Sequence, residues 1–216
     1  MCPYCSSSCI RHGTSRAGNK RYRCKTCKRT HSKRYFLTAC RSNISYKIKN
    51  LLKEGCGIRS ISRLLKISVT TVMKRIRMIA KNIDKPIVPF GKEYELDEMC
   101  TYVKSKTRKR WIVYAIRKDT REFVDFAIGN RTNQTLKRVT DTLILSNALK
   151  VFTDKLANYK SLLPSSIHST KYRGTNYIER KNLTLRIHLK RLNRRTICFS
   201  KSEQMLSACL KKYFWG

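Results

Sequence analysis

The stretch "RWIVYAIRKDTREFVDFAIG" (residues 110–129) decides the fold class of this chain. Its two halves, "RWIVYAIR" and "EFVDFAIG", are rich in β-branched and aromatic residues, which is typical of strands. The polar "KDTR" between them predicts a turn, so the whole stretch indicates a β-hairpin. "EYELDEMCTYV" (residues 93–103), just before it, has a further strand pattern.

The residues after the hairpin alternate between helix and strand patterns. "RTNQTLKRVTDTLIL" (residues 131–145) predicts a helix with Leu136, Val139, Leu143 and Ile144 facing inward. "ALKVFTD" (residues 148–154) predicts a short apolar strand that ends in an acid. Two more helices are expected, over about 176–192 and 201–212. This order predicts an α/β domain with a mixed sheet.

Three apolar stripes precede this region and predict three short helices between residues 44 and 79. Ser68 suits the N-cap of the third, with Ile67 and Val72 placed as a hydrophobic staple. A tight turn before the last of three helices is typical of a helix-turn-helix. The third helix would present polar and basic residues to DNA, namely Thr70, Thr71, Lys74, Arg75 and Arg77. The alternative is a plain three-helix packing module.

Four cysteines near the start form two C-x-x-C pairs separated by 18 residues: Cys2, Cys5, Cys24 and Cys27. This spacing predicts a structural Zn²⁺ site, because two such turns close a tetrahedral all-sulfur site with no open position. The alternatives are cysteines without metal, or a ligand set in which Cys9, His12 or His31 replaces one of the four.

The charge of the chain points to a polyanionic partner. Its 216 residues carry 49 Lys and Arg against 13 Asp and Glu, a net charge of +36. That balance is the electrostatic footprint expected for nucleic-acid binding. No apolar run is long enough to cross a bilayer and the start "MCPYC" has no signal-peptide pattern, so no membrane partner and an intracellular location are expected.

Charge and linker patterns divide the chain into parts. Nine of the 13 acids lie between residues 91 and 154, which indicates a separate domain there. "KPIVPFGK" (residues 85–92) has two prolines and a glycine, as linkers do. We therefore expect a zinc-binding module (1–38), a helix-turn-helix (39–84), a linker (85–92) and an α/β domain (93–216).

Three acids attract attention within this basic chain. Asp97 falls in the first strand, Asp154 ends the fourth, and Glu179 begins a later helix in a segment with few other acids. Side chains at strand ends converge at one edge of an α/β sheet. Three converging carboxylates would repel one another, and two divalent cations such as Mg²⁺ relieve that repulsion.

Other interpretations of the acids stay open at this point. Glu95 and Glu98 flank Asp97 and could be the ligands instead, and Glu179 could pair with Arg173 or Arg186. The remaining acids of the domain are expected in turns, in caps or on the solvated surface: Asp119, Glu122, Asp125 and Asp141.

At these residues the chain resembles the insertion sequence 1 family of transposases. The matching segments are "CPYC" and "CKTC", "YELDEM" around Asp97, "VFTD" at Asp154 and "NYIERKNLTLR" around Glu179, with 24 residues between Asp154 and Glu179. The resemblance implies an RNase H-like DDE domain that uses Mg²⁺ or Mn²⁺. It also implies a DNA-holding role for Arg186, two helical turns after Glu179, for which His188 and Lys190 compete.

The resulting hypothesis is a DNA transposase of the prokaryotic cytoplasm, associated with the nucleoid. The zinc and helix-turn-helix modules would bind the terminal inverted repeats as a homo-oligomer on double-stranded DNA. The catalytic domain would cut a strand to free a 3′-OH and transfer that 3′-OH into target DNA. The alternatives are a non-catalytic zinc and helix-turn-helix regulator of the element, and a structure-specific nuclease that hydrolyses without joining.

Overall fold

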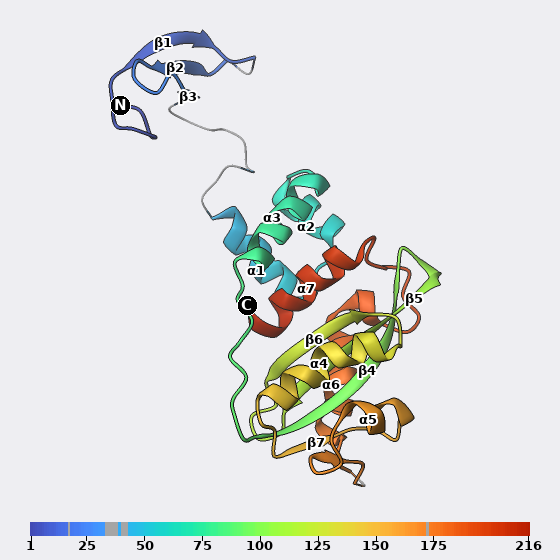
Figure 1. The fold of residues 1–216 in the computed structure, drawn as a ribbon. Helices are drawn as coiled ribbons and strands as arrows, with labels where there is room; N and C mark the ends of the chain where they lie inside the picture. Colours follow the sequence, from blue (N-terminus) through green and yellow to red (C-terminus); the bar gives the residue numbers. More distant parts are fainter. Residues whose placement is uncertain (17, 33–38, 40–42, 172) are drawn as a thin grey trace.

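The computed structural model describes residues 1–16, 18–32, 39, 43–171 and 173–216 (Figure 1). The domain boundary that is expected after residue 38 lies outside these residues. Cys40 also lies outside them. None of the helices in the described ranges is both long and apolar enough to cross a membrane.

A five-stranded mixed sheet forms the centre of the C-terminal half. Its strands, in spatial order, are β6 (Phe123–Gly129), β5 (Ser105–Arg117), β4 (Glu93–Val103), β7 (Lys150–Phe152) and β8 (His168–Ser169). The pairs β4–β5 and β5–β6 are antiparallel, whereas β4–β7 and β7–β8 are parallel. The expected hairpin and the mixed α/β character are therefore confirmed.

Helices cover both faces of this sheet (Figure 1). Tyr94 and Leu96 of β4 belong to a buried cluster with α4 (Asn133–Leu145) and α5 (Ala157–Leu162). Met99 and Val103 lie in a second cluster with α6 (Asn176–His188) and α7 (Glu203–Trp215). Successive side chains of β4 point to opposite faces of the sheet, so each face has its own buried core.

Several elements differ from the sequence-based expectation in length. The expected helix over 176–192 ends at His188, because Leu189 is extended, and a short 3-10 helix (Lys190–Leu192) follows. The last helix begins at Glu203, where the Ser202 hydroxyl caps it by accepting a hydrogen bond from the Met205 amide at 3.2 Å, and it continues to Trp215. The helix α5 and the strand β8 were not anticipated, since six and two residues are too short to show a period.

The acid Asp125 corrects another expectation. It was expected in a turn, in a cap or in solvent, but it lies within β6 with only 6% of its surface exposed. Its carboxylate accepts a hydrogen bond from Thr142 and pairs with Lys85, both at 2.7 Å. Asp125 thus ties the linker and α4 to the sheet, because a buried carboxylate needs such partners.

Three helices precede the sheet: α1 (Ile44–Lys53), α2 (Ile58–Leu65) and α3 (Val69–Lys81). Ser68 caps α3, since its hydroxyl accepts a hydrogen bond from the Thr71 amide at 3.1 Å. The apolar stripes pack into one buried cluster that includes Ile48, Ile61 and Val72. Fully burying each such side chain contributes about 1.5–3 kcal/mol.

The helix α7 belongs to two cores at once. Met205, Ala208 and Cys209 complete the cluster of α1, α2 and α3, whereas Leu206 and Leu210 pack against the sheet. In Figure 1, α7 runs between the three helices and the sheet. The three-helix unit therefore depends on the last helix of the chain for its buried surface.

A glycine brings the three-helix unit against α6. Gly55, in the turn after α1, has a φ of +69°, a left-handed conformation that favours glycine. A Cβ at this position would lie 2.1 Å from the carbonyl oxygen of His188, the last residue of α6. Only a residue without a side chain permits this approach.

The N-terminal region is a small antiparallel sheet of β1 (Cys9–Thr14), β2 (Lys20–Cys24) and β3 (Thr30–Ser32). Among its described residues, only Cys2, Cys24 and His31 are buried. So small a core stabilises little, and domains of this size ordinarily need a metal or disulfides.

Candidate active site

Asp97 lies in the middle of β4, opposite Tyr114 of β5. Its two carboxylate oxygens accept hydrogen bonds from the Glu98 amide at 2.7 Å and from the Asn182 side chain of α6 at 2.6 Å. Burial raises the pKa of Asp97 to about 6, and the nearby charges of Glu98 and Asp154 add to that rise. The hydrogen bonds oppose the rise without cancelling it, so this carboxylate favours a cation beside it.

Asp154 follows β7 by two residues and is exposed. Its Oδ1 accepts a hydrogen bond from the Leu156 amide at 3.0 Å. Because β7 is parallel to β4 and adjacent to it, Asp154 comes close to Asp97 and Glu98. One ligand oxygen from each of these three acids lies within 4.8 Å of the others.

Glu98 accepts more hydrogen bonds than the other two acids of this group. Its side chain is 1% exposed. Arg131 donates to Oε1 at 2.6 and 3.0 Å, and the Tyr159 hydroxyl donates to Oε2 at 2.7 Å. Asp97 and Asp154 therefore have more free coordinating capacity than Glu98 does.

Glu179 lies in the first turn of α6 and is exposed. Its Oε1 accepts a hydrogen bond from the Thr175 hydroxyl at 2.9 Å. It is not part of the 4.8 Å group. The structure thus brings Asp97 and Asp154 together and places Glu179 on the helix that touches Asp97 through Asn182.

Arg186 lies near the end of the same helix and is half-buried. It donates a hydrogen bond to the carbonyl oxygen of Leu192 at 3.1 Å. Burial lowers the pKa of Arg186, and the charge of Arg194 lowers it further. In this structure Arg186 holds the segment that follows α6.

Glu95 lies two residues before Asp97 and is completely buried beneath α6. Its Oε2 accepts a hydrogen bond from the Ile178 amide in the first turn of α6 at 2.8 Å, and burial raises its pKa. Its Oε1 has no hydrogen-bond partner among the described residues. Glu95 anchors α6 to β4 and is closed off from any ligand in solvent.

The residues expected to contact DNA lie on or near the surface of α3. Thr70, Lys74 and Arg77 are exposed, whereas Thr71 and Arg75 are half-buried. The hydroxyls of Thr70 and Thr71 lie 2.9 and 2.8 Å from that of Ser68. Arg75 donates to the Ala39 carbonyl at 3.1 Å. Lys74 and Arg77 therefore have the greatest freedom to reach a phosphate.

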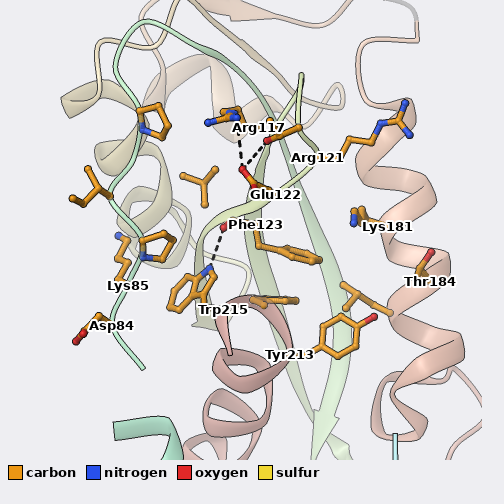
Figure 2. Close-up of a pocket in the computed structure, with 17 residues that line it drawn as sticks. Asp84, Lys85, Arg117, Arg121, Glu122, Phe123, Lys181, Thr184, Tyr213 and Trp215 are labelled. Carbon is orange, nitrogen blue, oxygen red and sulfur yellow. Dashed lines mark hydrogen bonds and ion pairs between the residues drawn. The ribbon is translucent and has the colours of Figure 1, made fainter. Parts of the chain in front are cut away.

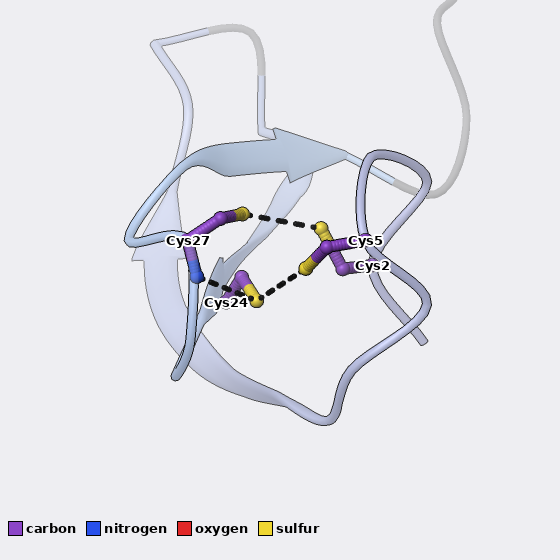
Figure 3. Close-up of side chains that lie close together, drawn as sticks. All are labelled: Cys2, Cys5, Cys24 and Cys27. Atoms are coloured by element: carbon purple, nitrogen blue, oxygen red, sulfur yellow. Dashed lines mark hydrogen bonds between the residues drawn. The ribbon is translucent and has the colours of Figure 1, made fainter.

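The four cysteines of the two C-x-x-C pairs come together, as Figure 3 shows. Their sulfur atoms all lie within 4.8 Å of one another, with 3.6 Å between Cys2 and Cys27 and 3.4 Å between Cys5 and Cys24. A tetrahedral zinc thiolate site needs sulfur–sulfur distances of about 3.8 Å, so the arrangement fits Zn²⁺.

The thiol pKa values also fit a cation among these cysteines. The Ser7 amide is the main group that lowers the pKa of Cys5, to about 6. The Arg29 amide lowers the pKa of Cys27, but burial and the other three thiols outweigh it and raise the value to about 12. Four crowded sulfurs cannot all ionise without a metal. A second group, of Cys2, Cys9 and His31, shares one of these ligands.

The acid cluster fits Mg²⁺ in the chemistry of its ligands. Carboxylate oxygens are hard ligands, which this ion prefers. Burial is the main cause of the raised pKa of Asp97, and the negative charges of Glu98 and Asp154 add to it, so a cation bound here would lower that pKa. Asp97 and Asp154 are the residues with oxygens available to hold the ion.

Two residues that support the site, Asn182 and Tyr114, were not predicted from the sequence. The Tyr114 hydroxyl donates to Asn182 Oδ1 at 2.9 Å, and Asn182 in turn donates to Asp97. The spacing of Asn182 carried a usable signal, since it lies three residues after Glu179 on a neighbouring position of the same helix surface. Tyr114 had no such signal, because its role depends on the pairing of β4 with β5.

Comparison with known proteins gives a family for this chain. Residues 93–214 match the family model described as IS1 transposase. The chain is 38% identical over 119 residues to the insertion element IS1 protein InsB of Shigella flexneri, covering 55% of this chain and 91% of that protein. It is 35% identical over 125 residues to the iso-IS1n protein InsB of Shigella dysenteriae, covering 56% and 95%.

A structural likeness adds little to these matches. A chain of a simian T-cell lymphotropic virus intasome in complex with the PP2A regulatory subunit B56 gamma aligns with a TM-score of 0.37 and 16% identity. The alignment covers 76% of this chain and 66%, just under two thirds, of that one. A likeness this low does not establish a shared fold.

A mixed α/β domain with a carboxylate cluster, in so basic a chain and with these sequence matches, defines a transposase, an enzyme class that cuts and joins DNA. The chain belongs to the IS1 transposase family.

Proposed function

We propose that this protein is a DDE-type transposase in which Asp97, Asp154 and Glu179 hold divalent Mg²⁺ or Mn²⁺. The observation that carries the proposal is the approach of Asp97 and Asp154 to within 4.8 Å, in a domain that matches the IS1 family model. The sheet, with three antiparallel strands followed by two parallel ones, supports an RNase H-like core.

The chain's own residues supply the geometry of the reaction. Asp97 presents a carboxylate fixed by the Glu98 amide and Asn182, and Asp154 presents one fixed by the Leu156 amide. Glu179 is the exposed carboxylate on the adjoining helix and completes the set. When bound, the metal ions would activate the attacking oxygen and stabilise the leaving oxygen of a phosphodiester.

The reaction has two displacements at phosphorus. Water attacks a phosphodiester at the end of the element, and the bond to the 3′ oxygen breaks to leave a free 3′-OH. That 3′-OH then attacks a target phosphodiester, so one bond forms as another breaks and no oxidant or reductant is needed. The 49 Lys and Arg residues of the chain would attract the polyanionic substrate.

The N-terminal part of the chain would recognise the terminal inverted repeats. Helix α3 presents Lys74 and Arg77, with Thr70 beside them, as a helix-turn-helix recognition helix would. Zn²⁺ bound by Cys2, Cys5, Cys24 and Cys27 would hold the small basic sheet together. Since two ends of an element must be joined, we expect a homo-oligomer on the DNA, in the nucleoid of a prokaryotic cytoplasm.

A strand-transfer assay tests the proposal. It uses a labelled duplex with the element's end, a target plasmid and Mg²⁺, with Asp97→Ala, Asp154→Ala and Glu179→Ala beside wild type. We expect joined product from wild type and none from the three variants, while Glu54→Ala, which removes an exposed acid outside the site, behaves as wild type.

Other outcomes would point to other functions. Binding of the duplex by all proteins, with neither cut nor joined product, would support a non-catalytic regulator that uses zinc and the helix-turn-helix. Cutting without joining would support a nuclease. Full activity of Asp97→Ala would remove this site from the mechanism.

A further inference from the structure

A cavity of about 870 Å³ lies on the α6 side of the sheet, away from the acid cluster. Its walls come from four separate segments: the linker before β4, the turn between β5 and β6, α6, and the end of α7. Figure 2 shows the linker with Lys85 on one side and α6 with Lys181 on the other. Aromatic side chains from β6 and α7 lie between these walls.

The aromatic rings of this cavity are held in fixed positions. Phe123 and Phe214 stack with a centroid distance of 3.9 Å and an interplanar angle of 16°. The indole nitrogen of Trp215 donates to the Phe123 carbonyl at 3.0 Å. These rings and Tyr213 are only half-buried, so part of each remains accessible. Fixed, partly exposed rings are suitable platforms for stacking a nucleobase.

Two cations of the cavity are not neutralised. Within the described residues, Arg121 and Lys181 form no ion pair with a carboxylate. The Arg121 guanidinium lies 4.2 Å from the centre of the Tyr177 ring, and Lys181 Nζ lies 5.2 Å from that of Phe123. These positive charges beside aromatic rings match the chemistry of a nucleotide, which has one phosphate and one flat base.

The cavity is also connected to the candidate active site. The Tyr114 ring lies 5.6 Å from Phe123 and 6.0 Å from Phe214, while its hydroxyl contacts Asn182, which holds Asp97. Lys181 is the residue immediately before Asn182. The side chains of Tyr114 and Asn182 therefore link the aromatic rings of the cavity to Asp97.

We propose that this cavity binds an unpaired nucleotide of the DNA strand being processed. The base stacks on the aromatic surface of Phe123 and Phe214, and the backbone phosphate pairs with Arg121 and Lys181. A second copy of the chain suits the cavity less well, because a chain with 49 Lys and Arg and only 13 Asp and Glu offers few carboxylates to pair with Arg121 and Lys181. The identity of the strand as a substrate rests on the proposed function, whereas binding of the nucleotide does not.

Photo-crosslinking of the full-length protein tests the proposal directly. The probe is a duplex with a single-stranded overhang of a few nucleotides that carries 5-iodouracil, in buffer without Mg²⁺ or Mn²⁺. We expect crosslinked peptides that contain Phe123 or the segment 213–215. A blunt duplex with 5-iodouracil at its paired end should not give these peptides.

A binding comparison adds a matched control. For Arg121→Gln/Lys181→Gln, we expect the affinity for the overhang duplex, relative to the blunt duplex, to fall about ten-fold. The control Lys137→Gln/Lys150→Gln removes two exposed charges elsewhere and should keep the wild-type ratio. An equal fall in both double variants would mean general electrostatics and would overturn the proposal.

The remaining outcomes separate this proposal from the proposed function. Strand cleavage by wild type with no crosslink in the cavity would refute the cavity as a nucleotide site and leave the transposase function intact. Crosslinks in the cavity without cleavage would keep the nucleotide site and contradict the catalytic function. Loss of self-association in Arg121→Gln/Lys181→Gln, with an unchanged overhang preference, would make the cavity a subunit interface and overturn the proposal.

Discussion

The side-chain amide of Asn182 donates a hydrogen bond to Asp97 at 2.6 Å and so joins α6 to the central strand β4. The Tyr114 hydroxyl fixes the orientation of this amide from the other side, at 2.9 Å. Asp97 therefore has one oxygen directed by its own strand and the other by the helix that carries Glu179. Partners of this kind set the position and basicity of a metal ligand.

Removal of this hydrogen bond should weaken metal use. For Asn182→Ala we expect strand cleavage to fall about 10- to 100-fold, with more Mg²⁺ needed for half-maximal activity. A titration of activity against Mg²⁺ measures both effects. Tyr114→Phe keeps the ring and removes only the hydroxyl, so a smaller change in the same direction is expected. An unchanged Mg²⁺ requirement in Asn182→Ala would contradict a positioning role.

Neutralisation of Asp97 should stabilise the protein without metal. Its pKa is raised from 3.8 to about 6 in the folded state, so the folded protein holds this proton more tightly than the unfolded chain does. Stability that is present below about pH 4 is therefore lost as the pH rises through about 6. The shift corresponds to at most about 3 kcal/mol, and partial exposure reduces it to about 1–2 kcal/mol for Asp97→Asn at pH 7.5.

Denaturant unfolding at pH 7.5 and pH 4, in buffer without divalent ions, measures this effect. The increase in the free energy of unfolding that Asp97→Asn causes should be much smaller at pH 4, where the wild-type carboxyl is mostly protonated. Added Mg²⁺ should stabilise wild type more than the variant, because only wild type keeps the full set of acids. Equal free energies of unfolding of the two proteins at pH 7.5 would show that the pKa of Asp97 is not raised in the folded state.

The zinc prediction has a matched control in Cys9. We expect one zinc ion per chain, and loss of that ion in Cys24→Ser, because its sulfur lies inside the four-cysteine group. Cys9→Ser should keep the metal, although Cys9 lies near Cys2 and His31. Metal analysis by mass spectrometry under native conditions measures the stoichiometry. Retention in Cys24→Ser with loss in Cys9→Ser would instead identify the group with His31 as the site.

Substitution of Gly55 should loosen the contact between the three-helix unit and α6. A methyl group there meets the His188 carbonyl at 2.1 Å and also strains a backbone with φ of +69°, so we expect Gly55→Ala to cost about 2–4 kcal/mol. Gly57→Ala is the control, since its new methyl group meets nothing closer than 4.0 Å, and the expected cost is below about 1 kcal/mol. Thermal unfolding of both variants tests this difference.

Local sequence patterns predicted most of the fold. The strand Glu93–Val103 matches its pattern to the residue, and Leu136, Val139 and Leu143 face the core as their spacing indicates. Elements such as α5 and β8 are too short to show a periodic pattern of apolar residues in the sequence. The second role of α7 was also invisible, because a helix with apolar residues on two sides does not reveal which neighbour each side meets.

The candidate site was predictable only in part. Asp97 and Asp154 were expected together at converging strand ends. In the structure Asp97 lies in the middle of β4, and the parallel pairing of Glu95 with Phe152 brings Asp154 level with it. The bonds of Glu98 with Arg131 and Tyr159, which distinguish it from Asp97, depend on contacts between distant segments. The position of Glu179 outside the close acid group depends on how α6 begins, which no spacing rule gives.

The shared burial of α7 has an evolutionary consequence. Met205, Ala208 and Cys209 cover the helices that precede the sheet, although they lie far from those helices in the sequence. A recombination event that exchanges the first 84 residues with those of a relative would therefore import a surface shaped for a different last helix. Among relatives of this chain, changes in the buried residues of α1 to α3 should consequently be accompanied by compensating changes in α7.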